Sequence, residues 1–193
     1  MKTLIVNGSP RRKGGTATLV SLLRQRLEGE VTVVETYFAG ISPCVDCRYC
    51  WTHPACAIAD GMEEVYQKIS EADAIVLASP IYFAELTGSL LQWASRLQYL
   101  WISRRFRGQE ALESKLRRGG ILLVGGSDGH TDTAVAMASR LLRCMGAEPV
   151  GQVCLSGTDG TGDHPPEIGV HTLRQLDRLA ALLQGKAGGQ EKS

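Results

Sequence analysis

Short apolar runs alternate with amphipathic segments along most of the chain. Five runs rich in Val, Ile or Leu predict strands at residues 2–7, 31–36, 74–78, 120–124 and 149–155. Segments with apolar residues three or four positions apart predict helices at residues 16–27, 62–71, 88–100, 131–145 and 170–184. Gly146 stands where a helix C-cap is expected. Apolar strands that alternate with helices are typical of a parallel sheet covered by helices on both faces.

This order of elements predicts an α/β fold with a doubly wound five-stranded parallel sheet, in the flavodoxin-like strand order 2-1-3-4-5. The 193 residues suit a single domain, which we expect to span residues 1–184 with an insertion at residues 37–60. The glycine-containing tail at 185–193 is expected to be disordered. In this fold, ligands bind outside the carboxyl ends of the strands, near the switch point between strands 1 and 3. Function is therefore expected in the loops at that edge.

Composition excludes several classes of protein. The formal net charge is +1 and the Lys and Arg residues are scattered, which argues against a nucleic-acid-binding protein. The chain enters its first strand directly, and no apolar stretch approaches the roughly 20 residues that span a bilayer. We expect a cytoplasmic protein without a membrane role. In that reducing compartment, clustered cysteines indicate metal binding or redox chemistry before structural disulfides.

The loop at residues 8–16, with the sequence GSPRRKGGT, joins the first strand to the first helix. Its glycines let the backbone approach an anion, and the helix start offers free N–H groups and a favourable dipole. Neither the phosphate-loop pattern of nucleotide triphosphatases nor the dinucleotide fingerprint is present. The alternative is a flexible loop in which Thr16 only caps a helix. The candidate phosphate contacts are Ser9, Arg11 and Thr16, with Arg12 a weaker candidate.

Two further loops follow the third and fourth predicted strands. The first carries two aromatic residues that need a flat surface to cover them, such as an isoalloxazine ring, although core packing of Phe83 explains that residue equally well. The second offers backbone and polar groups suited to a ring edge, beside His130, which we interpret as a solvated loop residue. The candidate contacts in these two loops are Pro80, Ile81, Tyr82, Phe83, Gly125, Gly126, Ser127 and Asp128.

Four cysteines, Cys44, Cys47, Cys50 and Cys56, form a C-x2-C-x2-C-x5-C run in the insertion. Two-residue gaps between soft ligands bring the sulfurs together around one centre, and this rhythm indicates a 4Fe-4S cluster before zinc. Another metal, or free or disulfide-linked thiols, remain alternatives. The other two cysteines, at positions 144 and 154, fall in a predicted helix and strand and are interpreted as core residues.

Together, GSPR, SPIYF and the VGG after the fourth strand resemble the NADPH-dependent FMN reductase family of flavodoxin-like flavoproteins, over about residues 1 to 155. The cysteine run resembles the iron-sulfur flavoprotein branch of that family. The resemblance implies that Ser9, Arg11 and Thr16 bind the FMN phosphate, and that residues 80–83 and 125–128 contact the flavin ring. Four positions depart from the family pattern: Gly15 replaces Asn, Ala84 replaces Gly, and Leu91 and Ser95 replace Lys and Asp.

The activity that the resemblance implies is oxidation of NAD(P)H. Electrons pass through FMN, and through a 4Fe-4S cluster if one is present, to a small acceptor or a protein partner. No general acid is required, so the catalytic residues remain unknown. A non-enzymatic flavodoxin-type electron carrier and a redox or metal sensor are the alternatives. The resemblance also implies a homodimer or homotetramer, with a candidate interface on the helix at 88–100 that includes Trp93, Tyr99 and the following Trp101. Core packing explains part of this apolar helix equally well.

Overall fold

The computed structural model describes residues 1–126, 131–159 and 166–186. Its sheet has the order β2-β1-β3-β5-β6, and all neighbouring strands on this path are parallel. These strands are β1 (Lys2–Asn7), β2 (Glu30–Glu35), β3 (Ala74–Tyr82), β5 (Arg117–Val124) and β6 (Ala147–Leu155). The predicted order 2-1-3-4-5 is confirmed. A sixth strand, β4 (Glu85–Leu86), was not predicted and pairs antiparallel with the end of β3.

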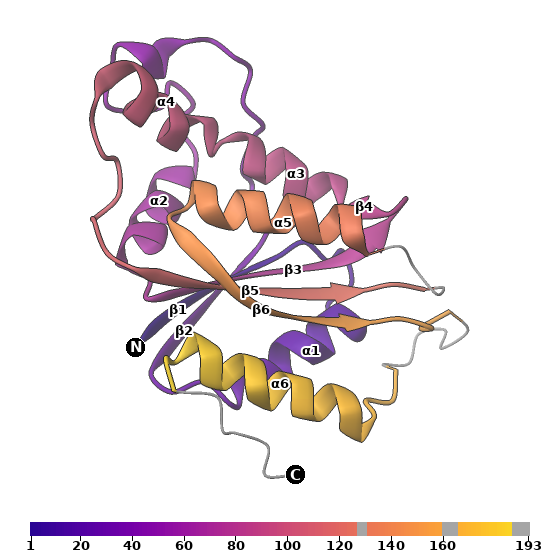
Figure 1. Ribbon diagram of the computed structural model, residues 1–193. Coiled ribbons are helices and arrows are strands. Elements are labelled where there is room, and N and C mark those ends of the chain that lie inside the picture. Colours follow the sequence, from indigo (N-terminus) through magenta and orange to yellow (C-terminus); the bar gives the residue numbers. More distant parts are fainter. Residues whose placement is uncertain (127–130, 160–165, 187–193) are drawn as a thin grey trace.

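Helices cover both faces of the sheet, as Figure 1 shows. Alternate side chains of β1 point to opposite faces, because Leu4 and Val6 join one core cluster while Ile5 joins the other. The Ile5 face is covered by α1 (Gly15–Arg24) and α6 (Val170–Leu183). The opposite face is covered by α2 (Met62–Glu71), α3 (Gly88–Ser95) and α5 (Asp132–Cys144). Beyond this second layer lie α4 (Gln98–Arg107) and the short 3₁₀ helix η1 (Tyr49–Trp51).

The helix predicted at 88–100 is two helices, so that prediction was wrong in extent. The break lies at Arg96 and Leu97, where Leu97 N donates to Ala94 O (2.9 Å) and Leu100 N to Leu97 O (3.0 Å), bonds of the tighter 3₁₀ type. The Tyr66 hydroxyl donates a hydrogen bond to the Arg96 carbonyl at 2.7 Å, so this carbonyl has a partner outside its own helix. Trp93, at 1% exposure, is packed in the monomer core and cannot form the expected interface.

Strand β3 continues four residues beyond its predicted end at Ala78 and then reverses through a two-residue turn into β4. Pro80 lacks an N–H, yet it still pairs with Val124 at the end of the sheet, where a missing donor is tolerated. Both turn residues, Phe83 (φ 54°) and Ala84 (φ 62°), adopt left-handed backbone, as the usual tight hairpin turn requires. The carboxyl edge of β3 is therefore a strained hairpin and not an open loop.

Other details follow the sequence closely. Gly146 has φ +72° directly after the C-cap of α5, as predicted. Most of the tail predicted to be disordered, residues 187–193, lies outside the described residues. Among the helices in residues 1–126, 131–159 and 166–186, none has the length and hydropathy that crossing a bilayer requires.

Candidate functional site

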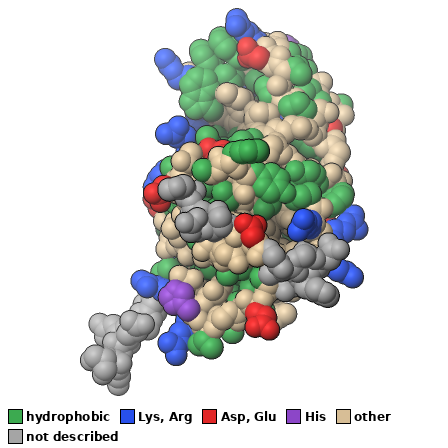
Figure 2. All heavy atoms as spheres, turned by 90° about the vertical axis from the view of Figure 1, so that its right-hand side faces the viewer, with side chains coloured by type: hydrophobic (Ala, Val, Ile, Leu, Met, Phe, Trp, Pro, Cys, Tyr) green, Lys and Arg blue, Asp and Glu red, His purple; other side chains and the backbone are tan. Residues whose placement is uncertain are grey.

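A cavity of about 450 Å³ lies at the carboxyl edge of the sheet, where the fold is expected to bind its ligands. Figure 2 looks onto this edge and shows hydrophobic side chains gathered on its upper half. Four segments build the cavity: the β1–α1 loop, the end of β3, the end of β5, and the chain between β6 and α6. Of the predicted contacts, the structure brings together here Ser9, Arg11, Thr16, Pro80, Ile81, Tyr82 and Gly126.

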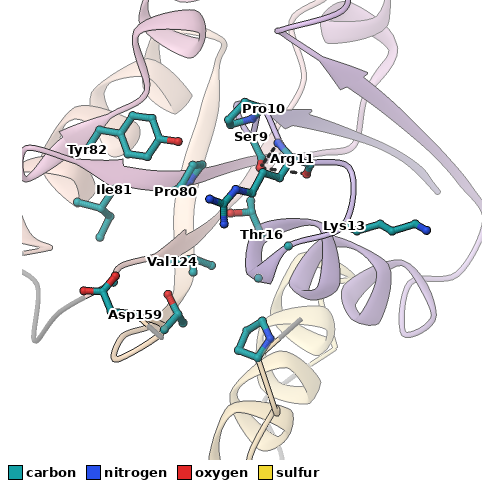
Figure 3. Close-up of a pocket in the computed structure, with 15 residues that line it drawn as sticks. Ser9, Pro10, Arg11, Lys13, Thr16, Pro80, Ile81, Tyr82, Val124 and Asp159 are labelled. Carbon is teal, nitrogen blue, oxygen red and sulfur yellow. Dashed lines mark hydrogen bonds between the residues drawn. The ribbon is translucent and has the colours of Figure 1, made fainter. Parts of the chain in front are cut away.

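One end of this cavity has features that suit an anion. Helix α1 begins at Gly15, its N-cap Gly14 makes no side-chain cap hydrogen bond, and no acidic residue lies in the first turn. The free N–H groups and the positive end of the helix dipole therefore meet the cavity together with the Arg11 guanidinium (Figure 3). Thr16 is 2% exposed and lies inside the helix, so it does not cap α1.

The loop before α1 is held in shape by Ser9. The Ser9 hydroxyl donates to Arg11 O and accepts from Arg11 N, each at 3.2 Å, and Ser9 N donates to Asn7 Oδ1 at 3.1 Å. These bonds fold the chain so that Arg11 faces the cavity. Arg12 turns away, since its guanidinium carbon lies 4.4 Å from the centre of the Phe38 ring. The structure thus favours Arg11 over Arg12 as the anion contact.

The opposite wall of the cavity comes from β3, with Pro80, Ile81 and the half-exposed Tyr82. Phe83 is fully exposed at the hairpin tip and does not line this cavity. Gly125 does not line it either, because its N–H donates to Leu155 O (2.8 Å) and its carbonyl accepts from Thr158. Ser127 and Asp128 lie outside the described residues, as does His130.

Sequence reasoning missed several residues that line this cavity. Some belong to loops that the sequence indicates as ligand-binding. Thr158, Asp159 and Pro166 lie beyond β6, where the sequence analysis predicts no contact. The rule that ligands bind at the carboxyl ends of strands applies to the last strand as well, and it indicates the segment after β6. The lining residues missed are Pro10, Lys13, Gly14, Gly15, Val124, Thr158, Asp159 and Pro166.

The start of α3 packs directly against the β1–α1 loop. Thr87 Oγ1 donates to Gly8 O at 2.7 Å, and a Cβ added to Gly8 would lie 2.8 Å from both Leu90 Cβ and Thr87 Oγ1. Only glycine allows this approach. The position of the β1–α1 loop is therefore set by α3 as well as by the sheet.

A second cavity, of about 390 Å³, is lined by Cys44, Cys47, Cys50 and Cys56. The four cysteine side chains thus share one cavity. Burial is the main cause that raises the pKa of Cys50 above its ordinary value, and the neighbouring Cys56, Cys44 and Cys47 add to it. Among the described residues, no three His, Cys, Asp or Glu side chains are arranged to hold one metal ion. The metal site itself stays a prediction.

Helices α3 and α4 supply the side chains that hold the cysteine-bearing segment. Gln92 Nε2 donates to Ile41 O (3.3 Å), Tyr99 Oη to Pro54 O (3.1 Å), and Arg107 to Cys50 O. Ser95 Oγ accepts from Cys44 N at 2.9 Å. The segment has little regular structure of its own, so these bonds fix its path.

Both ends of this segment meet at a buried ion pair. Arg96 Nη1 lies 2.7 Å from Asp60 Oδ2, and the side chains are 1% and 11% exposed. Arg96 also donates to Ser42 O (3.0 Å) and Ile58 O (3.3 Å). Burial favours the protonated carboxyl, but hydrogen bonds from Arg96, Met62 and Ser42 leave the pKa of Asp60 below its ordinary value. The pair is charged at neutral pH.

Comparisons with known proteins agree with this architecture. The family model described as NADPH-dependent FMN reductase matches residues 1–161. An iron-sulfur flavoprotein of Archaeoglobus fulgidus is 27% identical over 186 residues, covering 95% of this chain and 79% of the relative. An iron-sulfur flavoprotein of Methanocaldococcus jannaschii is 29% identical, covering 94% and 96%. Among solved structures, an NAD(P)H:quinone oxidoreductase from Methanothermobacter marburgensis superposes with a TM-score of 0.70 at 17% identity, covering 94% and 96%.

Proposed function

Since the chain belongs to the NADPH-dependent FMN reductase family and is a flavin oxidoreductase, we propose that it oxidises NAD(P)H through FMN bound in the first cavity. Electrons leave to a small acceptor or a protein partner. FMN, when bound, accepts a hydride as two electrons and releases them singly. The protein's part is to bind, orient and shield the flavin.

The observation that carries this proposal is that the first cavity has one end suited to an anion and another with an apolar, aromatic wall. At one end, the uncapped N-terminus of α1 and Arg11 suit a phosphate, whose charge the helix dipole also stabilises. At the other end, Pro80, Ile81 and Tyr82 offer an apolar and aromatic wall for a flat ring. A flavin mononucleotide has both parts. Thr16, buried at the cavity, adds a hydroxyl group at the phosphate end, and Ser9 contributes by holding the loop and Arg11 in place.

We further propose that the second cavity holds a 4Fe-4S cluster bound by Cys44, Cys47, Cys50 and Cys56. Four cysteine side chains that line one cavity are the donor set that such a cluster uses. The names of the two archaeal relatives support this proposal. When bound, the cluster carries single electrons. We infer that the two cavities together serve electron transfer, from the flavin cavity towards this second site.

The test uses anaerobically purified and reconstituted protein. We expect flavin absorption bands that bleach on addition of NADPH or NADH, together with bound iron and acid-labile sulfide. Cys50→Ala should lose most of the iron and sulfide and keep FMN, because the flavin cavity is built from other segments. Cys144→Ala is the matched control, since Cys144 packs against the core and lines neither cavity.

Three results would count against parts of the proposal. Bleaching by dithionite but by neither nicotinamide would replace the reductase with an electron carrier. FMN without iron or sulfide after reconstitution would remove the cluster. Equal loss of iron in Cys50→Ala and Cys144→Ala would remove the assignment of the cluster to this loop.

A further inference from the structure

The buried pair of Arg96 and Asp60 is not explained by stability alone. Taking two charges out of water costs free energy that their attraction often fails to return, so a buried ion pair is weak evidence for a role in stabilising the fold. This pair lies at the break between α3 and α4, and its two side chains are buried there. Its position relative to the cysteines suggests another role.

The pair joins the two ends of the cysteine-bearing segment. Arg96 donates to Ser42 O and Ile58 O, which lie two residues before Cys44 and two residues after Cys56. Asp60 Oδ2 accepts from Ser42 N at 3.0 Å as well as from Arg96. Residues 42–60 are thereby closed into a ring, and the four cysteines lie inside it. We call this ring the cysteine ring.

Arg96 also lines the cavity with the four cysteines. Its Nε is buried, and among the described residues it has no hydrogen-bond partner. A buried N–H without an acceptor is costly, and native structures rarely leave one. Burial disfavours the Arg96 charge, but the hydrogen bond to Asp60 keeps the pKa of Arg96 above its ordinary value, so the guanidinium stays charged.

Arg117 provides an internal comparison, since it is equally buried at 2% exposure. Its Nε donates to Ile69 O (3.0 Å) and its Nη2 to Ser70 O (2.7 Å) and Glu113 O (2.9 Å), so this guanidinium is used by backbone carbonyls. Arg117 does not line the cysteine cavity. The unpartnered Nε of Arg96 is therefore not a general property of buried arginines in this fold.

We propose that Arg96 is a positioning residue of the cysteine centre. With Asp60 it closes the cysteine ring so that the four cysteine sulfurs face one bound cluster. Its Nε–H donates to one sulfur of this centre, either a cysteine sulfur or a bound sulfide. The inference rests on the proposed iron-sulfur site. Hydrogen bonds and positive charge beside the sulfurs stabilise the more negative, reduced centre and so raise its reduction potential.

The test compares Arg96→Gln, Arg96→Lys and the control Arg117→Gln with wild type. In the iron-free full chain, hydrogen exchange should accelerate within residues 42–60 in both Arg96 variants and remain unchanged there in the control. After anaerobic reconstitution, Arg96→Gln should hold iron about 10- to 100-fold more weakly, the usual effect of removing an outer partner of a metal ligand. Its midpoint potential should be more negative than that of wild type, with Arg96→Lys between the two.

The outcomes separate this inference from the proposed function. If wild type takes up iron and sulfide but Arg96→Gln matches Arg117→Gln in exchange, iron retention and potential, the role of Arg96 is overturned and the cluster stands. If wild type takes up neither iron nor sulfide, the proposed cluster is wrong, and so is the proposed hydrogen bond from Arg96 Nε to its sulfur. Hydrogen exchange in the iron-free chain then decides whether Arg96 closes the ring, because that measurement needs no metal.

Discussion

At the scale of single residues, the two neighbouring arginines of the β1–α1 loop should behave differently. Arg11→Ala should weaken FMN binding by roughly 1.5 to 3 kcal/mol, or about ten- to hundredfold, the scale of one charge-assisted hydrogen bond. Arg12→Ala is the matched control and should leave affinity nearly unchanged, because Arg12 lies against Phe38 and not in the cavity. Flavin fluorescence quenching measures both. Equal losses in the two variants would contradict the placement of the phosphate at Arg11.

This difference shows what sequence reasoning can and cannot resolve at this scale. Glycines, hydroxyl groups and positive charge within residues 8–16 indicate an anion site, because those properties are local. Which arginine serves it depends on Phe38, which lies 26 residues beyond Arg12 in the sequence. Phe83 illustrates the same limit, since the structure places the ring at the exposed tip of a hairpin.

At the scale of elements, the turn between β3 and β4 should be under backbone strain. Ala84 has φ 62°, a conformation that costs a residue with a Cβ about 1–2 kcal/mol. Ala84→Gly removes that cost, while the greater freedom of glycine in the unfolded chain takes back about 0.5–1 kcal/mol. We expect a net gain of about 0.5–1 kcal/mol in the free energy of unfolding, measured by urea denaturation.

The control for this change is Ala136→Gly, at an exposed position inside α5. There the helical backbone favours alanine, and the same substitution should lower the free energy of unfolding by about 1 kcal/mol. The two variants should therefore differ in sign. Destabilisation by Ala84→Gly similar to that at Ala136 would show that the turn carries no such strain.

The elements themselves were largely predictable from the sequence. Strands buried on both faces appear as continuous apolar runs, and the strand order follows from their alternation with helices. The break at Arg96 was not predictable, because the apolar pattern continues through Leu97 and Leu100. Its external partner, the Tyr66 hydroxyl, belongs to another helix. Periodicity reports which face is buried and does not report which carbonyl finds a partner elsewhere.

At the scale of the whole molecule, the pH dependence of stability should show a plateau with a loss on each side. A hydrogen bond from Lys2 N–H lowers the pKa of Asp73 below its ordinary 3.8. Burial raises the pKa of Cys144 above its ordinary 9.0. Each lowered carboxyl contributes stability above its unfolded pKa and loses it as the pH falls through the folded value. Each raised thiol contributes below 9.0 and loses it as the pH rises through the folded value.

The free energy of unfolding of metal-free, reduced protein should therefore be nearly constant from about pH 5 to 8 and fall on both sides. Denaturant titrations at a series of pH values measure this profile. Asp73→Asn should reduce the loss on the acid side, because one lowered carboxyl is removed, and should leave the alkaline side unchanged. An acid side that is the same in Asp73→Asn and wild type would show that Asp73 does not contribute to it.

Helix α3 touches both candidate sites, since Thr87 at its start bonds to Gly8 in the β1–α1 loop and Arg96 at its end bonds to the cysteine ring. A substitution that shifts this ten-residue segment therefore changes both the β1–α1 loop and the cysteine ring, which limits how freely either site can change. An engineer who transplants residues 42–60 into another protein of this fold faces the same constraint. The carbonyls of that segment accept hydrogen bonds from Arg96 at the end of α3 and from Tyr99 and Arg107 on α4, so the graft has to include both helices.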